Sequence, residues 1–466
     1  MAGHAAPTGE AIAGAAIVHP AARLRGEIRV PGDKSISHRA LMLSLVAGGE
    51  SRIEGAGDGA DVRSTAGVAR ALGASVEGSV GGDGRAAYRV LSPGIDGFMR
   101  PTGALDCGNS GTSLRLFAGI LAGANLTATL DGDDSLRRRP VARIIEPLRA
   151  MGAKLSARDQ HSLPPVTVTG HPALRAIDWT TPVPSAQVKS AILLAGLRAD
   201  GTTRVRERVA TRDHTERMLR ARGVAVRSTS DSEGGSVIEI DGGEPVRAMN
   251  ERVPGDPSAA AVWLVAGAIH PDAVLGLPGV GTNPTRRGIV DLLLRMGADI
   301  TERPNADAET EGRRPDDIGE PVDVGEPIAD LTVRSSELRG IEVSPAEVAG
   351  AIDEIPILCL AATQASGRTT VRGAGELRHK ESDRLAGIVT GLRALGARIE
   401  IDGDDLRIDG PTPLVGAATD SLDDHRLAMT FAIAGLIATG PTGVGRPDSV
   451  AISYPGFFHD LERIRA

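Results

Sequence analysis

The sequence predicts a protein of the α/β (α+β) class, built from six repeated units that divide between two domains. The first observation is a helix, apolar on nearly every side, that recurs six times and stops at glycine or proline. The second is a leucine- and arginine-rich helix end that closes on glycine before an alternating strand. The third is the length of 466 residues, which exceeds one core and suits three units per domain.

The two recurring signals run in phase. The apolar helices stop at Gly48, Gly123, Gly201, Pro271, Gly367 and Gly440. The second series closes at Gly73, Gly152, Gly223, Gly297 and Gly396. Both series lengthen between the fourth and fifth units, as one insertion would make them. We assign the insertion to residues 301–330, which are acidic, rich in proline and poor in apolar residues, and expect it on the surface.

Each apolar helix carries its polar residues at its start. In the first unit, a loose tail at residues 1–22 precedes an alternating strand at residues 24–30, and a Pro-Gly breaker precedes a helix opening with Lys34 and Arg39. The later copies read GNSGTSLRLFAGILAG, SAQVKSAILLAGL, DPSAAAVWLVAGAIHP, IDEIPILCLAATQASG and DDHRLAMTFAIAGLIATG. A helix that is apolar on all sides is expected to be buried.

Helix starts of this kind favour anions. Their free N–H groups and partial positive charge attract phosphates and carboxylates, so convergent starts would make an anion site. The polar residues gathered at the starts are Lys34, Arg39, Gly111, Arg115, Gln187, Lys189, Asp353 and Arg426. The sequence therefore predicts a cleft that holds substrates with several negative charges.

The second and third units add further candidates. Gly111 stands at a helix start, where a backbone without a side chain can approach a ligand. Of the three adjacent arginines at residues 137–139, at most two can face one site. Arg212 precedes a helix-capping pattern that ends at Glu216.

The fifth unit is the richest in charged residues. Asp353 and Glu354 stand at a helix start. Lys380, Glu381 and Arg384 have helical spacing, so all three can face one way. Such a group on its own is more often an exposed ion-pair cluster than a site.

Composition argues against nucleic-acid and membrane partners. The net charge is −8 and aromatic residues make up 2% of the chain, so few platforms exist for stacking bases and no long basic stripe appears. The apolar helices run for about 12–15 residues, short of the roughly 20 that span a bilayer. The first twenty residues lack the pattern of a secretory signal. We expect a cytoplasmic monomer.

The cysteines and histidines do not indicate a metal site. Cys107 and Cys359 stand in apolar surroundings without CxxC spacing, so each is expected to be a small buried residue. The histidines show neither an HExxH motif nor paired spacing. The sequence predicts no metal and no cofactor.

Taken together, the motifs resemble those of the 5-enolpyruvylshikimate-3-phosphate synthases, also called 3-phosphoshikimate 1-carboxyvinyltransferases. The match covers residues 24–466 and rests on KSISHR, GNSGT, RRRP, SAQVKS, TRDHTE, IDEIP, KESDR and DHRLAM, in the order of the family. The forms SISHR and SAQVKS are similar to those of the bacterial class II subgroup.

The resemblance implies a particular architecture. The family has a two-domain inside-out α/β barrel of six βαβαββ repeats, three per domain, with the active site in the cleft between the domains. The chain crosses between domains twice, which here falls near Asp33 and Pro254. The first domain would then comprise residues 1–32 and 255–466, and the second residues 33–254.

The resemblance also implies an activity. The family transfers the enolpyruvyl group of phosphoenolpyruvate to the 5-hydroxyl of shikimate 3-phosphate and releases phosphate, a step of aromatic amino acid biosynthesis. Such substrates need many fixed cations. By resemblance, shikimate 3-phosphate is held by Lys34, Ser35, Arg39, Ser185, Ala186, Gln187, Arg212, Asp353 and Lys380. Phosphoenolpyruvate is held by Lys34, the Gly111 backbone, Arg139, Gln187, Arg384 and Arg426.

The same resemblance assigns catalytic roles. Asp353 would be the base for the attacking hydroxyl, and Glu381, assisted by Lys34, would exchange a proton at the methylene carbon. In the family, glyphosate occupies the phosphoenolpyruvate site and tolerance accompanies a residue larger than Gly111, so we expect sensitivity. One departure is Ile452, where many relatives carry a lysine that contacts phosphoenolpyruvate.

Two other functions are weighed against this one. A UDP-N-acetylglucosamine enolpyruvyl transferase shares the fold and the donor but uses a loop cysteine, and neither cysteine here resembles it. A noncatalytic binder of phosphorylated metabolites would have arginines without a placed acid and base, whereas Asp353 and Glu381 supply both.

Overall fold

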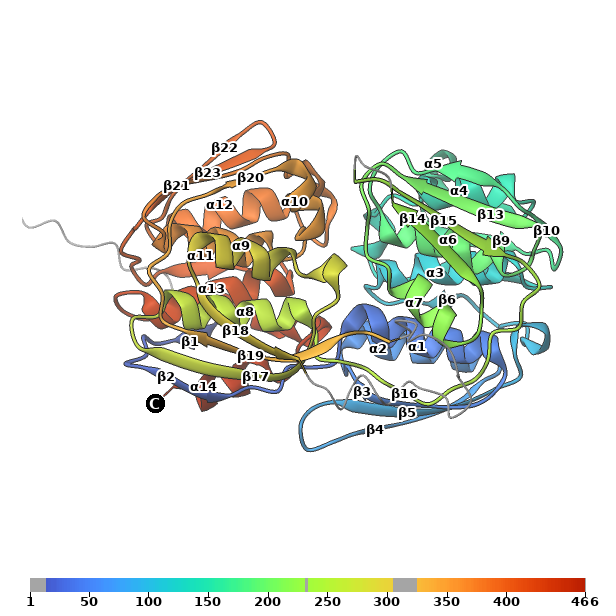
Figure 1. Ribbon diagram of the computed structural model, residues 1–466, viewed down its shortest axis with the longest axis horizontal. Coiled ribbons are helices and arrows are strands. Elements are labelled where there is room, and N and C mark those ends of the chain that lie inside the picture. The colour runs from blue at the N-terminus through green and yellow to red at the C-terminus, as the bar shows by residue number, and fades with distance from the viewer. Residues whose placement is uncertain (1–13, 231–233, 305–324, 466) are drawn as a thin grey trace, which may run out of the picture.

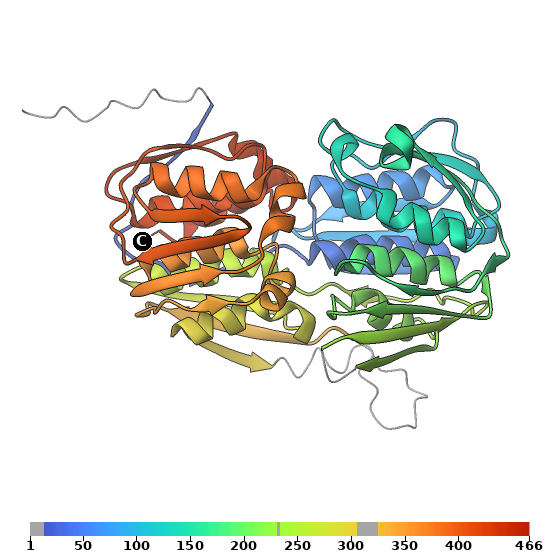
Figure 2. The ribbon, with the colours of Figure 1, turned by 90° about the horizontal axis from the view of Figure 1, so that it is seen from above.

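The computed structural model describes residues 14–230, 234–304 and 325–465, which form a mixed α/β fold with two lobes (Figure 1). Most of the predicted tail (1–13) and of the predicted insertion (305–324) lies outside the described residues. Figure 2 shows the two lobes side by side from above. Among the described helices, none is both long enough and apolar enough to span a membrane.

One order of elements, strand-helix-strand-helix-strand-strand, recurs along the chain. In the second unit it comprises β6 (Leu105–Asp106), α3 (Gly111–Ala122), β7 (Thr127–Asp131), α4 (Ala142–Ala150), β8 (Lys154–Ala157) and β9 (Leu163–Thr169). In the third it comprises β11 (Asp178–Thr180), α6 (Ala186–Gly196), β13 (Thr202–Glu207), α7 (His214–Ala221), β14 (Val226–Ser230) and β15 (Ser236–Asp241). In the fifth it comprises β20 (Glu342–Val343), α11 (Ile355–Gln364), β21 (Gly367–Val371), α12 (Arg384–Ala394), β22 (Arg398–Asp402) and β23 (Asp405–Gly410).

The first and fourth units exchange their leading strands. The first contains β2 (Leu24–Glu27), α1 (Lys34–Ala47), β3 (Gly49–Ala56), α2 (Ala60–Ala71), β4 (Ser75–Val80) and β5 (Ala86–Ser92). The fourth contains β16 (Glu251–Arg252), α8 (Pro257–Ile269), β17 (Ala273–Gly281), α9 (Gly288–Met296), β18 (Asp299–Pro304) and β19 (Ile328–Arg334). However, β2 pairs with β17 and β16 pairs with β3, so the chain passes from one lobe to the other after each of these strands.

The four-stranded sheets of the first five units share one strand order. It is β6-β7-β9-β8 in the second unit, and the same order recurs as β16-β3-β5-β4, β11-β13-β15-β14, β2-β17-β19-β18 and β20-β21-β23-β22. The first two strands of each sheet are parallel and the remaining pairs are antiparallel. Parallel neighbours need a crossover connection, which the buried helix provides in the second, third and fifth units, whereas in the first and fourth the paired strands come from distant parts of the chain.

The sixth unit differs from the predicted βαβαββ order. Its described elements are β24 (Ala418–Asp420), α13 (His425–Ile437), β25 (Thr442–Gly445), the 3₁₀ helix η5 (Pro447–Ile452) and α14 (Phe457–Arg463). Its sheet has three strands, and the third is β1 (Ala16–Val18), which pairs with β25. Residues 16–18 are therefore not part of a loose tail. The strand β1 pairs with β25 and so takes the place of the later strands that the other units contribute to their own sheets.

The predicted insertion starts later than residue 301. Residues 301–304 belong to β18, and residues 328–330 belong to β19, which pairs with β18. The composition of residues 301–304 is polar because β18 is the edge strand of its sheet, where side chains meet water, whereas β19 lies between β18 and β17.

The smaller elements lie within or between these units. They are η1 (Ile95–Gly97), η2 (Leu136–Arg138), α5 (Arg158–His161), β10 (Leu174–Arg175), β12 (Ala199–Asp200), η3 (Pro284–Arg286), α10 (Pro345–Gly350) and η4 (Gly375–His379). The strands β10 and β12 form a separate parallel pair. The second helix of each of the first five units ends before a glycine with positive φ, as the sequence pattern predicted.

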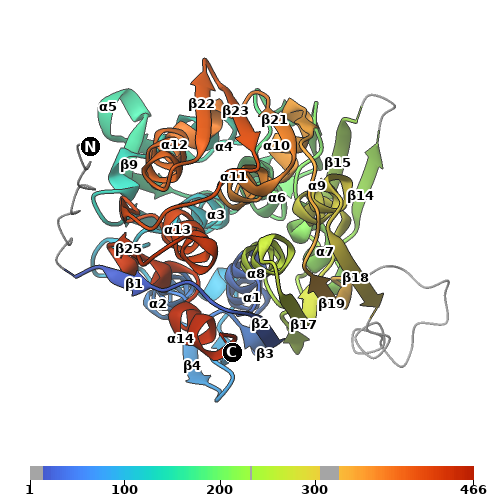
Figure 3. The same ribbon diagram turned by 90° about the vertical axis from the view of Figure 1, so that its left-hand side faces the viewer.

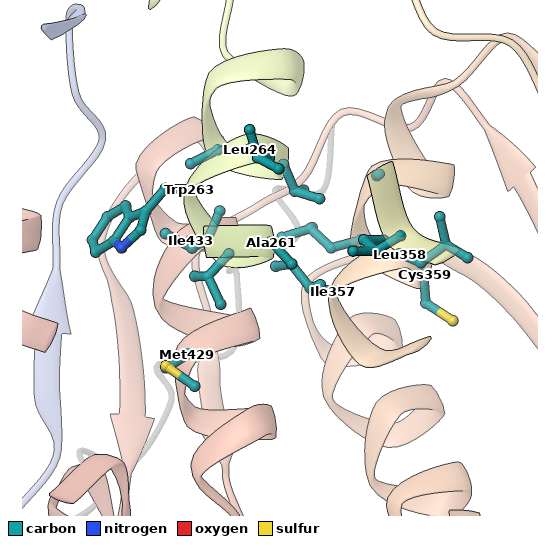
Figure 4. Close-up of a cluster of buried hydrophobic side chains, with 14 of the residues drawn as sticks. Ala261, Trp263, Leu264, Ile357, Leu358, Cys359, Met429 and Ile433 are labelled. Carbon is teal, nitrogen blue, oxygen red and sulfur yellow. The ribbon is translucent and has the colours of Figure 1, made fainter. Parts of the chain in front are cut away.

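The apolar helices fill the two lobes. The buried hydrophobic side chains form two separate clusters, one from residues 18–30 and 259–464 and the other from residues 36–253. In the first cluster, α8, α11 and α13 contribute Trp263, Leu358 and Ile433, which Figure 4 shows together. Figure 3 shows these three helices nearly end-on. Their axes therefore run along the line joining the lobes. Nearly all residues of the three helices are buried, so the prediction of burial is confirmed.

Candidate active site

One cavity of about 1030 Å³ is lined by residues of both lobes. The starts of α1, α3, α6, α8, α11 and α13 all contribute to it, so the predicted convergence of six helix starts is confirmed. The residues predicted for substrate binding and catalysis also line it: Lys34, Ser35, Arg39, Gly111, Arg139, Ser185, Ala186, Gln187, Arg212, Asp353, Lys380, Glu381, Arg384 and Arg426. Ile452, in η5, is not among the described lining residues.

The helix starts supply less positive charge than expected. Asp33 caps α1 by accepting from Ile36 N at 2.8 Å, and Asp256 and Asp424 cap α8 and α13 in the same way. A carboxylate at this position satisfies a free N–H group and offsets the positive helix end. By contrast, α3 and α6 are capped by the neutral hydroxyls of Ser110 and Ser185. The start of α11 carries the acidic residues Asp353 and Glu354, so the positive field of helices in the cavity comes mainly from α3 and α6.

Side-chain cations supply the rest, and four of them surround Asp353. Arg212 reaches across the cavity to place Nη2 2.8 Å from Asp353 Oδ2. Lys380 Nζ and Arg384 Nη1 lie 3.4 and 3.3 Å from Oδ1. Burial raises the pKa of Asp353, but Lys380, Arg212, Arg426 and Arg384 outweigh it and hold the pKa well below its ordinary value of 3.8. The carboxylate is therefore ionised at neutral pH.

Glu381 is the second ionised carboxylate of the cavity. Its Oε2 accepts from Arg384 Nη2 at 2.5 Å, and its Oε1 lies 3.9 Å from Arg139 Nη1. Burial raises the pKa of Glu381, but the neighbouring cations Arg384, Arg139 and Lys34 hold it well below 4.5. An anionic ligand would weaken the effect of these cations and raise both carboxyl pKa values.

The predicted helical face of the fifth unit is not formed. Lys380 and Glu381 lie in the turn before α12, which begins at Arg384. Asp383 ends the turn because its side chain accepts from Ala386 N at 3.0 Å and caps the helix. The charged groups still meet, since the turn directs Glu381 back towards the Arg384 guanidinium.

Two guanidinium groups in the cavity retain unused donors. Arg139 Nη2 donates to Asn109 Oδ1 at 2.6 Å, but its buried Nε has no partner among the described residues, and the same is true of Arg426 Nε. Of the three adjacent arginines, Arg139 lines the cavity, whereas Arg137 pairs with Asp131 at 2.8 Å. Buried donors without partners are costly, and an anion would satisfy them.

Lys189 and Arg115 differ from the expectation. Lys189 does not line the cavity, because its buried Nζ lies 2.8 Å from both Glu207 and Glu216. Arg115 does line it, and its Nη1 donates to Gln187 Oε1 at 2.7 Å. Burial lowers the pKa of Arg115 to about 10, so it stays protonated at neutral pH. Lys189 therefore stabilises the lobe, while Arg115 orients Gln187.

Sequence reasoning missed two residues of the cavity. Asp61 lies in the first turn of α2 and its Oδ2 is 2.5 Å from Lys34 Nζ. An acid in a first helical turn is common, so nothing in the sequence singled it out. His425 starts α13, and burial, together with Arg426 and Lys34, holds its pKa well below 6.5, which keeps the imidazole neutral.

Gly111 opens α3 where space is limited. A Cβ built on it would lie 2.5 Å from Arg115 Nη1 and 3.5 Å from Arg139 Nη1. A side chain here would displace the end of Arg115 and fill part of the cavity. The glycine thus leaves the positive end of α3 open to a ligand.

The fold and the cavity define an enzyme that acts on small polyanions, with two ionised carboxylates among fixed cations. Comparison with known proteins identifies it further. The family model described as EPSP synthase (3-phosphoshikimate 1-carboxyvinyltransferase) matches residues 18–461. The 3-phosphoshikimate 1-carboxyvinyltransferase of Gloeobacter violaceus is 50% identical over 449 residues, covering 96% of this chain and 98% of the relative.

Two further comparisons agree with these matches. The enzyme of the same name from Bacillus cereus is 44% identical over 443 residues, covering 95% of this chain and 97% of the relative. The crystal structure of EPSP synthase from Acinetobacter baumannii has a TM-score of 0.81 and 39% identity, covering 96% of this chain and 97% of that chain. The chain belongs to the EPSP synthase family. It is a 3-phosphoshikimate 1-carboxyvinyltransferase of the shikimate pathway.

Proposed function

We propose that the cavity binds shikimate 3-phosphate and phosphoenolpyruvate side by side and transfers the enolpyruvyl group to the 5-hydroxyl, with release of phosphate. The observation that carries this proposal is the placement of Asp353 and Glu381, both ionised, among cations from both lobes. Two substrates with phosphates and carboxylates would satisfy those cations.

The substrate contacts follow the arrangement of the cavity. Shikimate 3-phosphate would be held by Lys34, Ser35, Arg39, Ser185, Ala186, Gln187, Arg212, Asp353 and Lys380. Phosphoenolpyruvate would be held by Lys34, the Gly111 backbone, Arg139, Gln187, Arg384 and Arg426. The Nε groups of Arg139 and Arg426, which have no hydrogen-bond partner among the described residues, and the neutral cap of α3 support the contacts proposed for phosphoenolpyruvate.

The chemistry requires one proton to leave and another to arrive. Asp353 would accept the proton of the 5-hydroxyl as this oxygen attacks phosphoenolpyruvate, and Glu381 would give and later remove a proton at the methylene carbon, with Lys34 assisting. Glu381 is ionised in the free enzyme, so this role needs its pKa to rise when phosphoenolpyruvate binds. The negative charge of the substrate acts in that direction.

We also propose the two-domain division at residues 32/33 and 254/255, in an inside-out α/β barrel that closes around both substrates. The two separate hydrophobic clusters and the exchanged strands β2 and β16 support it. We further propose a cytoplasmic monomer without nucleic-acid or membrane partners. In support, the exposed large apolar side chains of the described residues are spread over separate elements rather than gathered in one patch.

An assay of phosphate release tests the proposed reaction. With phosphoenolpyruvate as donor, we expect release with shikimate 3-phosphate and none with UDP-N-acetylglucosamine. Release with the second acceptor alone would favour the other enolpyruvyl transferase. Binding of both substrates without release would favour a noncatalytic protein.

The cysteines provide a separate test of the mechanism. Burial raises the pKa of the Cys359 thiol to about 12 and raises that of Cys107 still further, so neither is a ready nucleophile. We expect the Cys107→Ala, Cys359→Ala double variant to keep its turnover within about threefold, and iodoacetamide to leave the wild type active. Rapid loss of activity on alkylation, prevented by Cys107→Ala, would contradict a cysteine-independent reaction.

Gly111→Ala tests the site proposed for phosphoenolpyruvate. The methyl group would push Arg115 into the cavity, so glyphosate, an inhibitor of the phosphoenolpyruvate site, should bind more weakly. We expect a sensitive wild type and an inhibition constant raised by about tenfold or more in the variant, equivalent to about 1.4 kcal/mol. A matched change at Gly67, which lies in α2 without a positive φ and where a Cβ meets no atom within 4 Å, should leave inhibition unchanged. Equal potency against wild type and Gly111→Ala would count against this placement.

A further inference from the structure

The segment TRDHTE at residues 211–216 makes a polar contact from each of its six side chains, and all but that of Thr211 are to residues distant in the sequence. Three of these contacts hold it to its own lobe. Thr211 Oγ1 donates to Glu207 Oε1 at 2.5 Å, and Glu216 pairs with Lys189 Nζ at 2.8 Å. Thr215 Oγ1 accepts from Arg39 Nε at 2.7 Å. The segment is therefore fixed on the side of residues 36–253.

The other three side chains reach the opposite lobe. Arg212 pairs with Asp353 across the cavity. Asp213 Oδ1 accepts from Asn283 Nδ2 at 2.7 Å, and His214 Nδ1 lies 2.7 Å from Glu326 Oε1. Arg212 thus sits directly beside two contacts that join the lobes. We call the four residues Asp213, His214, Asn283 and Glu326 the interlock.

The interlock is largely buried, with Asp213 the most exposed of the four side chains at 26%, and the buried His214 Nε2 has no hydrogen-bond partner among the described residues. The His214 side chain is 1% exposed and that of Glu326 is 9% exposed. Asn283 donates through one amide group to Asp213 Oδ1 and to Glu326 Oε2, both at 2.7 Å, so all four residues are linked. Burial alone would raise the pKa of Glu326, but His214, Asn283 and Arg217 lower it to about 2, which keeps the carboxylate charged.

The N-cap side chain of α7 forms contacts between the lobes instead of capping its helix. Asp213 is the N-cap residue of α7, but its side chain makes no capping hydrogen bond. It bonds instead to Asn283 and Thr285 of the other lobe, and to Arg217. Asp normally stabilises a helix when it caps it. The predicted capping pattern is therefore wrong, and the side chain is used between the lobes.

The opposite side of the interlock is anchored where the chain crosses between lobes. Asn283 caps the 3₁₀ helix η3, and Arg286 of that helix pairs with Asp33 at 3.1 Å and with Asp256 at 3.2 Å. Asp33 and Asp256 stand at the two crossings of the chain. Arg286 also lies 4.0 Å from Glu354, the neighbour of Asp353, so the interlock connects the segment that carries Arg212 to the one that carries Asp353.

We propose that the interlock is a positioning device for Arg212, and that it sets the affinity for shikimate 3-phosphate without taking part in the chemical step. This inference rests on the proposed contact of Arg212 with that substrate. Because the contacts of Asp213 and His214 fix the backbone beside Arg212, its guanidinium needs no reorganisation when a phosphate or hydroxyl group of the substrate binds. Without these contacts, the guanidinium would first have to be brought into place.

Steady-state kinetics of the full-length enzyme test the inference. Glu326→Ala and Asn283→Ala should each raise KM for shikimate 3-phosphate by about tenfold, with kcat and KM for phosphoenolpyruvate changed by less than about twofold. His214→Ala should behave in the same way, whereas His214→Gln, whose amide can donate to Glu326, should restore most of the affinity. Glu302→Ala is the matched control, because it removes an ion pair with Arg287 within one lobe.

A double-variant cycle separates positioning from a general loss of stability. In an Arg212→Ala background, Glu326→Ala should raise KM no further, because its target is already gone. An additive effect, a parallel fall in kcat, or no effect of any interlock variant would overturn the inference. If Arg212→Ala itself leaves KM for shikimate 3-phosphate unchanged, the proposed role of Arg212 fails as well. If only the interlock variants are silent, the inference alone fails.

Discussion

Replacing Glu381 by alanine lowers kcat by about 10²–10⁴-fold, the range expected when a general acid–base group is lost. The affinity for shikimate 3-phosphate should change little, because the proposed contacts of that substrate do not include Glu381. The carboxylate lies between Arg384 and Arg139, two proposed contacts of phosphoenolpyruvate, and is therefore placed to serve its methylene carbon.

Phosphate release measured at saturating substrates checks this prediction. Glu381→Gln should be nearly as impaired as Glu381→Ala, since its amide keeps the shape but cannot exchange the proton. Asp383→Asn, two residues further along the same turn, is the control, because asparagine also caps helices well. A kcat within tenfold of wild type for both Glu381 variants would contradict the assignment.

Replacing Arg384 by leucine should give the largest loss of stability, about 3–5 kcal/mol, with loss of activity. The Arg384 side chain is 1% exposed and meets three carboxylates. They are Asp424 at 2.7 Å, Glu381 at 2.5 Å and Asp353 at 3.3 Å. Without the guanidinium, buried negative charges would lack their main partner, which is more costly than losing an exposed ion pair.

Urea unfolding at pH 7 and at lower pH checks this prediction. The low folded-state pKa values of Asp353 and Glu381 add stability above their ordinary values of 3.8 and 4.5, and this stability is lost as the pH falls through the lower folded-state values. The gap between wild type and Arg384→Leu should therefore narrow below about pH 4. Arg378→Leu, which removes exposed ion pairs, should cost less than about 1 kcal/mol. A similar cost for both variants would contradict a central role for Arg384.

The sequence carried enough information to predict the helices and their repetition. The apolar helices are long, and their ends are marked by residues with a single physical reason, such as Gly73 and Gly152 in the left-handed region. The polar starts could be recognised because Lys34, Gly111 and Arg426 interrupt otherwise apolar segments. Their convergence on one cavity follows from the repetition, since each unit places its helix in the same way.

The pairing between distant segments could not be predicted in the same way. The exchange of β2 and β16 depends on sheet contacts between residues 249 and 198 positions apart, and two- to four-residue strands leave almost no periodic signal. The same holds for Lys189, which has the residue type and position of a site cation but finds two buried glutamates in its own lobe. The residue type indicated a positive charge at position 189, but its partners, Glu207 and Glu216, depend on how the lobe packs.

The origin of the positive field also needed the structure. The sequence predicted that six positive helix starts converge on one anion site, but Asp33, Asp256 and Asp424 cap three of those starts. These aspartates are good capping residues, and each offsets the positive end of its helix. The positive field of the cavity therefore comes from α3, α6 and the side-chain cations.

A crystal structure with shikimate 3-phosphate and glyphosate bound would test the central claim most directly, namely that these helix starts and cations hold two anions side by side. We predict the shikimate phosphate and carboxylate against Ser35, Ser185 and Arg212. We predict glyphosate against the Gly111 backbone, Arg139 and Arg426. Ligands bound elsewhere, or in the cavity without contact to these groups, would contradict the account.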